Sequence, residues 1–165
     1  MGYDNRNNLG RSGGKFNQTG SDYKKGQLPQ GYLAGGYFET VNGEEVLKKD
    51  YIVKYSKEIA DALSNKQEWD SGKEQNKRSQ IRKYYEYCLR IQGSMQRKNG
   101  DFAAVESELN RLLPFIEYAR SRSTVSELFR VFINKNISQI HEAKELNAFI
   151  KHFEAIVAYL PKEKN

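Results

Sequence analysis

Few side chains in this sequence have the types and spacing of a catalytic or metal-binding site. The two histidines, His141 and His152, lie eleven residues apart, without the His-x-x-x-His or carboxylate-rich spacing of metal ligands. The sequence contains no Gly-rich phosphate loop between a strand and a helix and no Gly-x-Ser-x-Gly motif. Its carboxylates are scattered where a Lys or Arg can pair with them, as Glu86 can with Arg90 four residues later. The sequence therefore predicts no enzyme, no metal and no cofactor.

The chemistry that the sequence does offer is cationic. Lys83, Arg90 and Arg97 follow one another at seven-residue spacing, which places them on one side of a helix. At 1.5 Å rise per residue they form a line about 20 Å long, which suits contacts with successive phosphates. Further basic side chains flank this line or extend it if the chain folds back toward it. They are Lys77, Arg78, Arg82, Arg120 and Arg122.

The charge balance favours a polyanionic partner. The 165 residues include 27 Lys and Arg against 21 Asp and Glu, which gives a formal net charge of +6. Residues 66–99 alone hold nine basic and four acidic side chains, so most of the excess surrounds one helix. The sequence leaves three interpretations of this basic face open: nucleic-acid binding, an acidic protein partner, and ordinary solvation.

The element that must position these cations is a helix from about Ser79 to Lys98. Ser79 is expected to cap its start, and Asn99-Gly100 to end it. Opposite the cations, the core-facing positions recur at spacings of three and four. They are Ile81, Tyr84, Tyr85, Cys88, Gln92 and Met95. The only cysteine lies in this stripe, so we expect a buried thiol and no disulfide.

Four more helices are predicted from the same periodicity, over residues 44–63, 101–120, 124–137 and 146–160. Pro114 should kink or divide the third helix of the chain near Leu113. Thr124 and Glu127 have the spacing of a capping box for the fourth. We therefore expect an all-α fold, a single five-helix bundle over residues 44–161, followed by a short C-terminal tail at 162–165.

The N-terminal segment has a different composition. Residues 1–43 hold ten of the thirteen glycines, many Asn and Ser, and little aliphatic content, so we expect a disordered Gly/Asn-rich tail. Its interleaved aromatic and basic residues would give either weak contacts with single-stranded nucleic acid or a solvated extension. Trp69, in a predicted loop, either stacks on a base or folds back onto the bundle. No apolar run is long enough to span a membrane, so we expect a cytoplasmic protein without a membrane partner.

Three blocks within residues 45–160 resemble a known family. They are Ser79-Gln80-Ile81-Arg82-Lys83-Tyr84, Ile116-Glu117-Tyr118-Ala119-Arg120, and Phe149-Ile150-Lys151-His152-Phe153-Glu154-Ala155-Ile156-Val157-Ala158-Tyr159. In this order they are similar to the small helical subunit of the type III-A CRISPR effector, the Csm complex.

The resemblance implies a non-catalytic five-helix subunit, whose copies stack beside other subunits of the Csm complex. It would hold guide RNA and target RNA through sugar–phosphate contacts without sequence specificity. The family's Ser-x-Ile-Arg-Lys helix start falls on Ser79, Ile81, Arg82 and Lys83, which adds Ser79 to the expected RNA-binding residues, and its Ala-Arg pair falls on Ala119 and Arg120. The alternative function is a helical protein–protein adaptor with a basic face.

Overall fold

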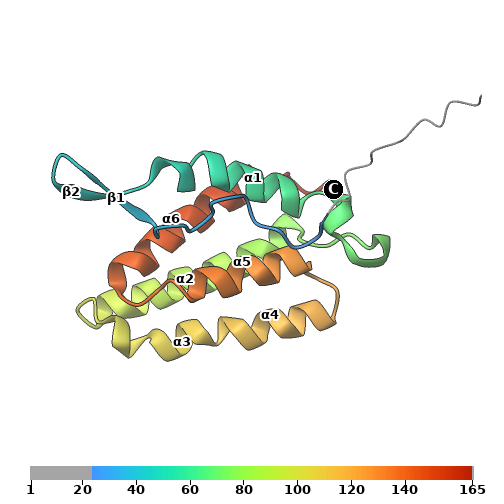
Figure 1. Ribbon diagram of the computed structural model, residues 1–165. Helices are drawn as coiled ribbons and strands as arrows, with labels where there is room; N and C mark the ends of the chain where they lie inside the picture. The colour runs from blue at the N-terminus through green and yellow to red at the C-terminus, as the bar shows by residue number, and fades with distance from the viewer. Residues whose placement is uncertain (1–23, 165) are drawn as a thin grey trace, which may run out of the picture.

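The computed structural model describes residues 24–164, except for the side chain of Ser71, and it is mainly helical. Figure 1 shows α1 (Lys54–Leu63) and α6 (Ala143–Tyr159) along one side, α2 (Arg78–Arg97) and α5 (Glu127–Ile137) in the middle, and α3 (Glu106–Asn110) followed by α4 (Leu112–Ser121) along the other side. Helix α6 packs against α1 and α2, while α4 packs against α5. This confirms the predicted helical bundle.

The core is built from the helix stripes that the periodicity predicts. Helix α2 buries Ile81, Cys88 and Met95, and also Ile91, which the predicted stripe did not include. Phe153 of α6 is fully buried, with its ring centroid 5.6 Å from those of Phe132 and Phe149, 5.7 Å from Tyr85 and 6.2 Å from Phe129. Such contacts between apolar rings stabilise the packing of α2, α5 and α6.

The predicted third helix is divided in two, as Pro114 led us to expect. Helix α3 ends at Asn110 and α4 begins at Leu112, so Pro114 occupies the first turn of α4. A proline is tolerated there because the backbone N–H that it lacks would have no partner within the helix.

The predicted N-terminal tail is too long at its C-terminal end. Residues 24–37 run across the bundle, and Tyr32 and Tyr37 bury their rings there. The chain then forms a hairpin of β1 (Phe38–Val41) and β2 (Glu44–Leu47), which projects from one end of the molecule (Figure 1). The predicted helix over 44–63 is consequently wrong at its start, since α1 begins only at Lys54. Residues 1–23 of the predicted tail lie outside the described residues.

The hairpin follows from the dipeptide Asn42-Gly43, a turn signal that was overlooked because it lies in a glycine-rich segment. Asn42 and Gly43, at the turn, have φ angles of 52° and 80°. Positive φ at both central residues is the requirement of the two-residue turn that best matches the twist of a β-hairpin, and Asn-Gly satisfies it with little strain. The strands carry mostly exposed side chains, so the hairpin adds little to the core.

Two predicted helix caps are wrong: the N-caps lie two residues away from the predicted positions, and distant residues form hydrogen bonds at both helix starts. The N-cap of α2 is Lys77, and the backbone N–H of Ser79 donates 2.7 Å to a carboxylate oxygen of Glu163. Helix α5 begins at Glu127 rather than at Thr124, and its N-cap residue is Ser126. The Asn76 side chain accepts a hydrogen bond from the Ser126 N–H at 2.8 Å and donates one to its hydroxyl at 2.7 Å. The start of α5 is thus satisfied by the loop that precedes α2.

A buried polar cluster lies where the N-terminal segment meets α5 and α6. Nε2 of His152 is 2.7 Å from the Tyr32 hydroxyl, and Nδ1 is 2.5 Å from the Tyr51 carbonyl oxygen. These distances fit a neutral ring that donates one hydrogen bond from Nδ1 and accepts another at Nε2. The Tyr37 hydroxyl donates 2.7 Å to the Asn136 side chain. Burial lowers the pKa of His152 to about 4, because charging the ring would require it to lose its hydration.

The loop after α1 folds back onto the bundle. The indole N–H of Trp69 donates 3.2 Å to the Leu63 carbonyl oxygen, which confirms the second of the two sequence-based interpretations of this residue. Within residues 24–164, no helix is long and apolar enough to cross a membrane.

Candidate nucleic-acid interface

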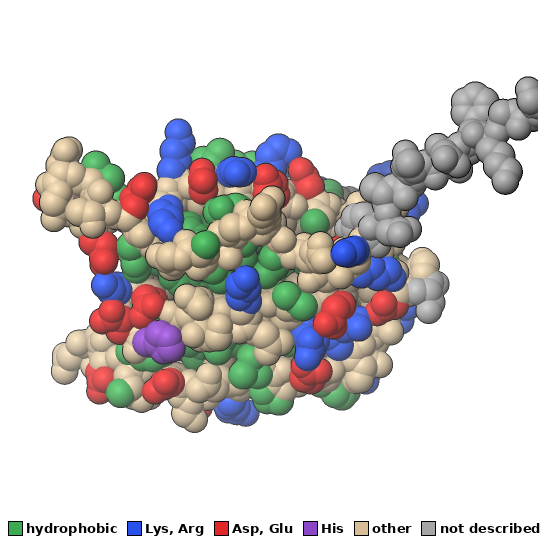
Figure 2. All heavy atoms as spheres, viewed as in Figure 1, with side chains coloured by type: hydrophobic (Ala, Val, Ile, Leu, Met, Phe, Trp, Pro, Cys, Tyr) green, Lys and Arg blue, Asp and Glu red, His purple; other side chains and the backbone are tan. Residues whose placement is uncertain are grey.

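The outer face of α2 presents the three cations that the sequence placed on one line. Lys83, Arg90 and Arg97 are exposed on a continuous helix of 20 residues. Within the described part of the chain none of the three forms an ion pair: the Lys83 ammonium approaches the Gln80 amide at 3.4 Å, and the Arg90 guanidinium lies 5.6 Å from the Tyr87 ring centroid. Their charges are therefore available to an external anion. On the face shown in Figure 2, by contrast, basic and acidic side chains are interspersed.

A groove lined by aromatic rings runs beside this line. It lies between α2 and α4, has a volume of about 310 Å³, and we call it the α2–α4 groove. Its lining residues are Lys83, Tyr84, Tyr87, Arg90, Phe115 and Tyr118. The rings of Tyr87 and Phe115 meet edge to face with centroids 5.6 Å apart. Lys83 and Arg90 of the cation line therefore lie next to an aromatic surface.

Arg122 extends this surface beyond the end of α4. Its guanidinium lies 5.6 Å from the Tyr118 ring centroid and donates 2.9 Å to the Tyr118 hydroxyl. Since Tyr118 and Lys83 line the same groove, the fold brings Arg122 to the same surface as the start of the cation line. The sequence alone could not place Arg122 there, because that requires α4 to run beside α2.

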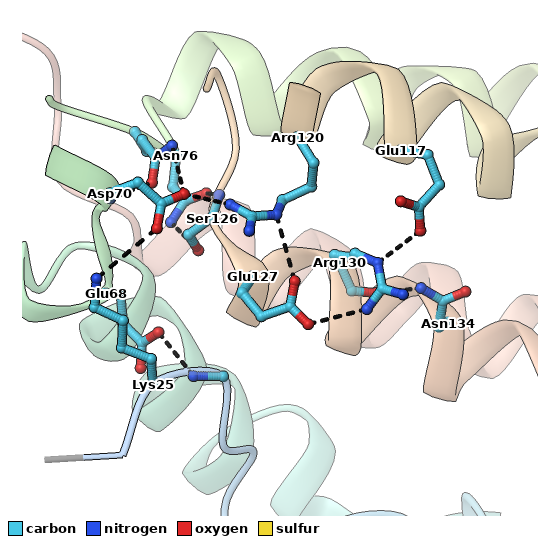
Figure 3. Close-up of polar contacts among 12 residues, drawn as sticks. Lys25, Glu68, Asp70, Asn76, Glu117, Arg120, Ser126, Glu127, Arg130 and Asn134 are labelled. Atoms are coloured by element: carbon cyan, nitrogen blue, oxygen red, sulfur yellow. Dashed lines mark hydrogen bonds and ion pairs between the residues drawn. The ribbon is translucent and has the colours of Figure 1, made fainter. Parts of the chain in front are cut away.

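Arg120 lies elsewhere, in a network of ion pairs (Figure 3). Its guanidinium is 2.5 Å from the Asp70 carboxylate and 3.4 Å from that of Glu127, and its side chain is only 24% exposed. Glu127 also pairs with Arg130, which pairs with Glu117, while Lys25 lies 3.8 Å from Asp70. The network joins the N-terminal segment, the loop before α2, α4 and α5.

The network lowers the pKa of Asp70. The hydrogen bond from Arg120 holds the pKa of Asp70 below its usual value, with smaller contributions from the charge of Arg120 and from Gln75 and Lys25. Arg120 is therefore neutralised within the fold, and an RNA phosphate would have to compete with two carboxylates for it.

The remaining predicted residues lie near the start of α2. Lys77 is 3.8 Å from Glu74, and Arg78 is half-buried. Arg82 pairs with Glu86 at 2.9 Å, so Glu86 neutralises Arg82 and not Arg90, its predicted partner. The Ser79 N–H is occupied by Glu163.

A cleft of about 590 Å³ opens between the start of α2 and the C-terminal segment. The side chains of Lys66, Trp69, Lys77, Arg78 and Lys162 contribute to its lining. It also contains the carboxylates of Glu74 and Glu163, so its charges are mixed. This second basic region is separate from the α2–α4 groove.

Sequence reasoning missed the rings that line the groove. Phe115 lies 5.4 Å from the Arg111 guanidinium, and Tyr118 pairs with Arg122 in the same way. Both pairs have i, i+4 spacing, which brings side chains together on one side of a helix. This repeat of an arginine and an aromatic residue was a usable signal, but the apolar periodicity assigned Phe115 to the core.

Neither a metal site nor a reactive thiol is formed by residues 24–164. No group of three or more His, Cys, Asp or Glu side chains within 24–164 could hold a metal ion. Cys88 is buried as predicted, and burial raises the pKa of its thiol to about 12, so it is no nucleophile near neutral pH.

Comparison with known proteins identifies a family for this chain. A family model described as Csm2 Type III-A matches residues 47–163, which include α1 to α6, the cation line and the α2–α4 groove. No curated protein and no solved structure matches the chain. Because the family model covers well over half of the sequence, the chain belongs to the Csm2 type III-A family, the small, non-catalytic subunit of the Csm effector complex of CRISPR.

Proposed function

We propose that the outer face of α2, together with Arg122, holds the guide–target RNA duplex of the Csm complex through its sugar–phosphate backbone. Membership of the family makes the chain a subunit that associates with the Csm complex and its guide RNA. The observation that carries the proposal is the line of Lys83, Arg90 and Arg97, exposed and without carboxylate partners among the described residues.

The pairing pattern separates the predicted residues into two groups. Arg82 and Arg120 have carboxylate partners that a phosphate would have to displace. Lys83, Arg90, Arg97 and Arg122 have none within residues 24–164, so they can neutralise phosphates and release the counterions of the RNA without breaking an ion pair. We therefore assign RNA contact to this second group. Lys77, Arg78 and Ser79 form a secondary region at the start of α2.

Such contacts would not read sequence. Phosphates carry no base identity, so a line of cations positions an RNA backbone and leaves recognition to the pairing of guide and target. The proposal includes neighbouring copies of the chain and other Csm subunits as protein partners, in the cytoplasm.

The test is the salt dependence of RNA binding by the full chain. Replacing Lys83, Arg90 and Arg97 together with Ala should weaken binding by similar factors for RNAs of unrelated sequence. The slope of log affinity against log salt should become shallower by about 0.7 for each lost contact with a single strand, hence by up to about 2.

A matched control removes the same charge elsewhere. Lys54, Lys135 and Lys151 are exposed on α1, α5 and α6, and replacing all three with Ala should leave the slope nearly unchanged. Equal effects of both triple variants would show that net charge alone matters and would contradict the proposal. Binding to an acidic protein partner with no affinity for RNA would instead support the adaptor.

A further inference from the structure

Three pairs of an arginine and an aromatic ring surround the α2–α4 groove. The guanidinium groups of Arg90, Arg111 and Arg122 lie 5.6, 5.4 and 5.6 Å from the ring centroids of their partners. These partners are Tyr87, Phe115 and Tyr118. Aromatic rings and guanidinium planes are the two kinds of side-chain surface on which unpaired RNA bases stack. Both kinds are concentrated around this groove.

The groove is accessible and built on a rigid base. Tyr118 is 62% exposed and Phe115 is 37% exposed, so part of each ring is accessible to a ligand. Tyr87 is held beside Phe115, because its hydroxyl donates 2.8 Å to the Glu108 carbonyl oxygen and its ring meets that of Phe115 edge to face. The volume of about 310 Å³ is at the lower end of ligand pockets, so it suits one flat ring rather than a helix or strand of a partner.

The charges around the groove select the occupant. Its lining includes two cations, Lys83 and Arg90, and no acidic side chain. The Glu108 carboxylate lies 3.4 Å from the Tyr87 hydroxyl and pairs with Arg111 at 3.3 Å, so it offsets the charge of Arg111 and not that of Lys83 or Arg90. They are seven residues apart on α2, which corresponds to about 10 Å along the helix axis. An apolar side chain of a protein partner would fill the groove but would supply no anion to pair with Lys83 and Arg90. A nucleotide supplies a flat ring for the groove and phosphates on either side for the cations.

We propose that the α2–α4 groove takes an unpaired base, at a point where the RNA held along α2 is single-stranded and not part of the guide–target duplex. The base stacks on Tyr118 and Phe115, and its flanking phosphates lie at Lys83 and Arg90. This inference rests on the proposed contact between α2 and RNA, and it adds a base contact to the backbone contact. Stacking accepts any base, because every base has a π-face, so the site is tolerant of sequence.

The experiment compares two ligands that differ only in their bases. The full chain is titrated with a mixed-sequence RNA decamer and with an abasic ribose–phosphate chain of the same length. The wild-type protein should bind the decamer about tenfold more tightly, the effect of about one stacked base. Tyr118→Ala should remove that preference and leave the affinity for the abasic chain nearly unchanged.

Three further variants separate the ring from other roles of Tyr118. Tyr118→Phe keeps the ring and should keep the preference for bases. Tyr118→Leu keeps an apolar contact without a ring and should lose the preference, so it also serves if the alanine variant folds poorly. Tyr159→Ala removes a tyrosine that is 44% exposed on α6, away from the groove, and should behave as wild type.

The outcomes distinguish this inference from the proposal on which it rests. Equal affinity for both ligands, with a steep salt dependence, overturns the stacking site and leaves the backbone contact intact. Weak binding of both ligands with no salt dependence overturns the backbone contact as well. If Tyr118→Ala changes only the self-association of the chain, the groove is a protein contact and the inference is wrong.

Discussion

Between pH 7 and pH 5, acidification should destabilise this protein mainly through His152. Its ring is fully buried and neutral, in contact with the Tyr32 hydroxyl and the Tyr51 carbonyl oxygen. Its pKa falls from 6.5 to about 4 on folding. Because the folded-state pKa is the lower one, the unfolded chain binds a proton more readily between these values. The stability that the neutral His152 ring contributes is therefore present above pH 6.5 and is lost as the pH falls toward 4.

The two pKa values set the size of the effect. They differ by about 2.5, and each pH unit between them changes the free energy of unfolding by about 1.4 kcal/mol, so the full loss is about 3 kcal/mol. Between pH 7 and pH 5 the loss attributable to His152 should be roughly 2 kcal/mol. This is a large fraction of the stability of a small domain.

Denaturant unfolding of the full chain at pH 7 and pH 5 measures this loss. His152→Gln has no titrating ring, so its stability should change less between the two pH values than that of the wild type, by roughly 2 kcal/mol. The matched control is His141→Gln, which makes the same substitution at an exposed histidine, so an effect specific to the buried ring should appear only in His152→Gln. The reasoning is refuted if His152→Gln and the wild type lose equal stability. Titration of the His152 ring by NMR checks the pKa directly.

Three further expectations test the packing around this site and the ion-pair network. Phe153→Ala should cost about 3–5 kcal/mol in denaturant unfolding, because its fully buried ring contacts four others; a cost below about 1 kcal/mol would contradict that packing. Tyr37→Phe should cost about 1 kcal/mol, since it leaves Asn136 without one donor, and an unchanged stability would show that the N-terminal segment does not pack there. Arg120→Ala should lower stability by about 1 kcal/mol while the salt slope of RNA binding stays as in the wild type; a shallower slope would assign Arg120 to the RNA surface.

The sequence by itself determined the existence of the helices, though not all of their starts, and the cation line. Both are local properties, because the 3.6-residue period fixes which side chains share a face of a helix. Lys83, Arg90 and Arg97 therefore lie opposite Ile81 and Cys88 in the structure, as the spacing required. The division of the third helix near Pro114 was predictable for the same reason, since proline acts on its own turn.

The sequence-based boundary of the core failed where stability comes from distant partners. The glycine content of residues 24–43 predicted disorder, but Tyr32 and Tyr37 find hydrogen-bond partners about a hundred residues away, in α5 and α6. Burial of two aromatic rings offsets the entropy of ordering a glycine-rich segment, and composition does not reveal that these partners exist.

Only the tertiary structure decided which of the predicted cations are held in ion pairs within the fold. Arg120 and Arg122 are two residues apart and look equivalent in the sequence. The fold places Arg120 between Asp70 and Glu127, and it places Arg122 over Tyr118 at the end of the α2–α4 groove. The physical reason is that an ion pair depends on distances of a few Å between side chains, and the Asp70 partner of Arg120 is fifty residues away along the chain.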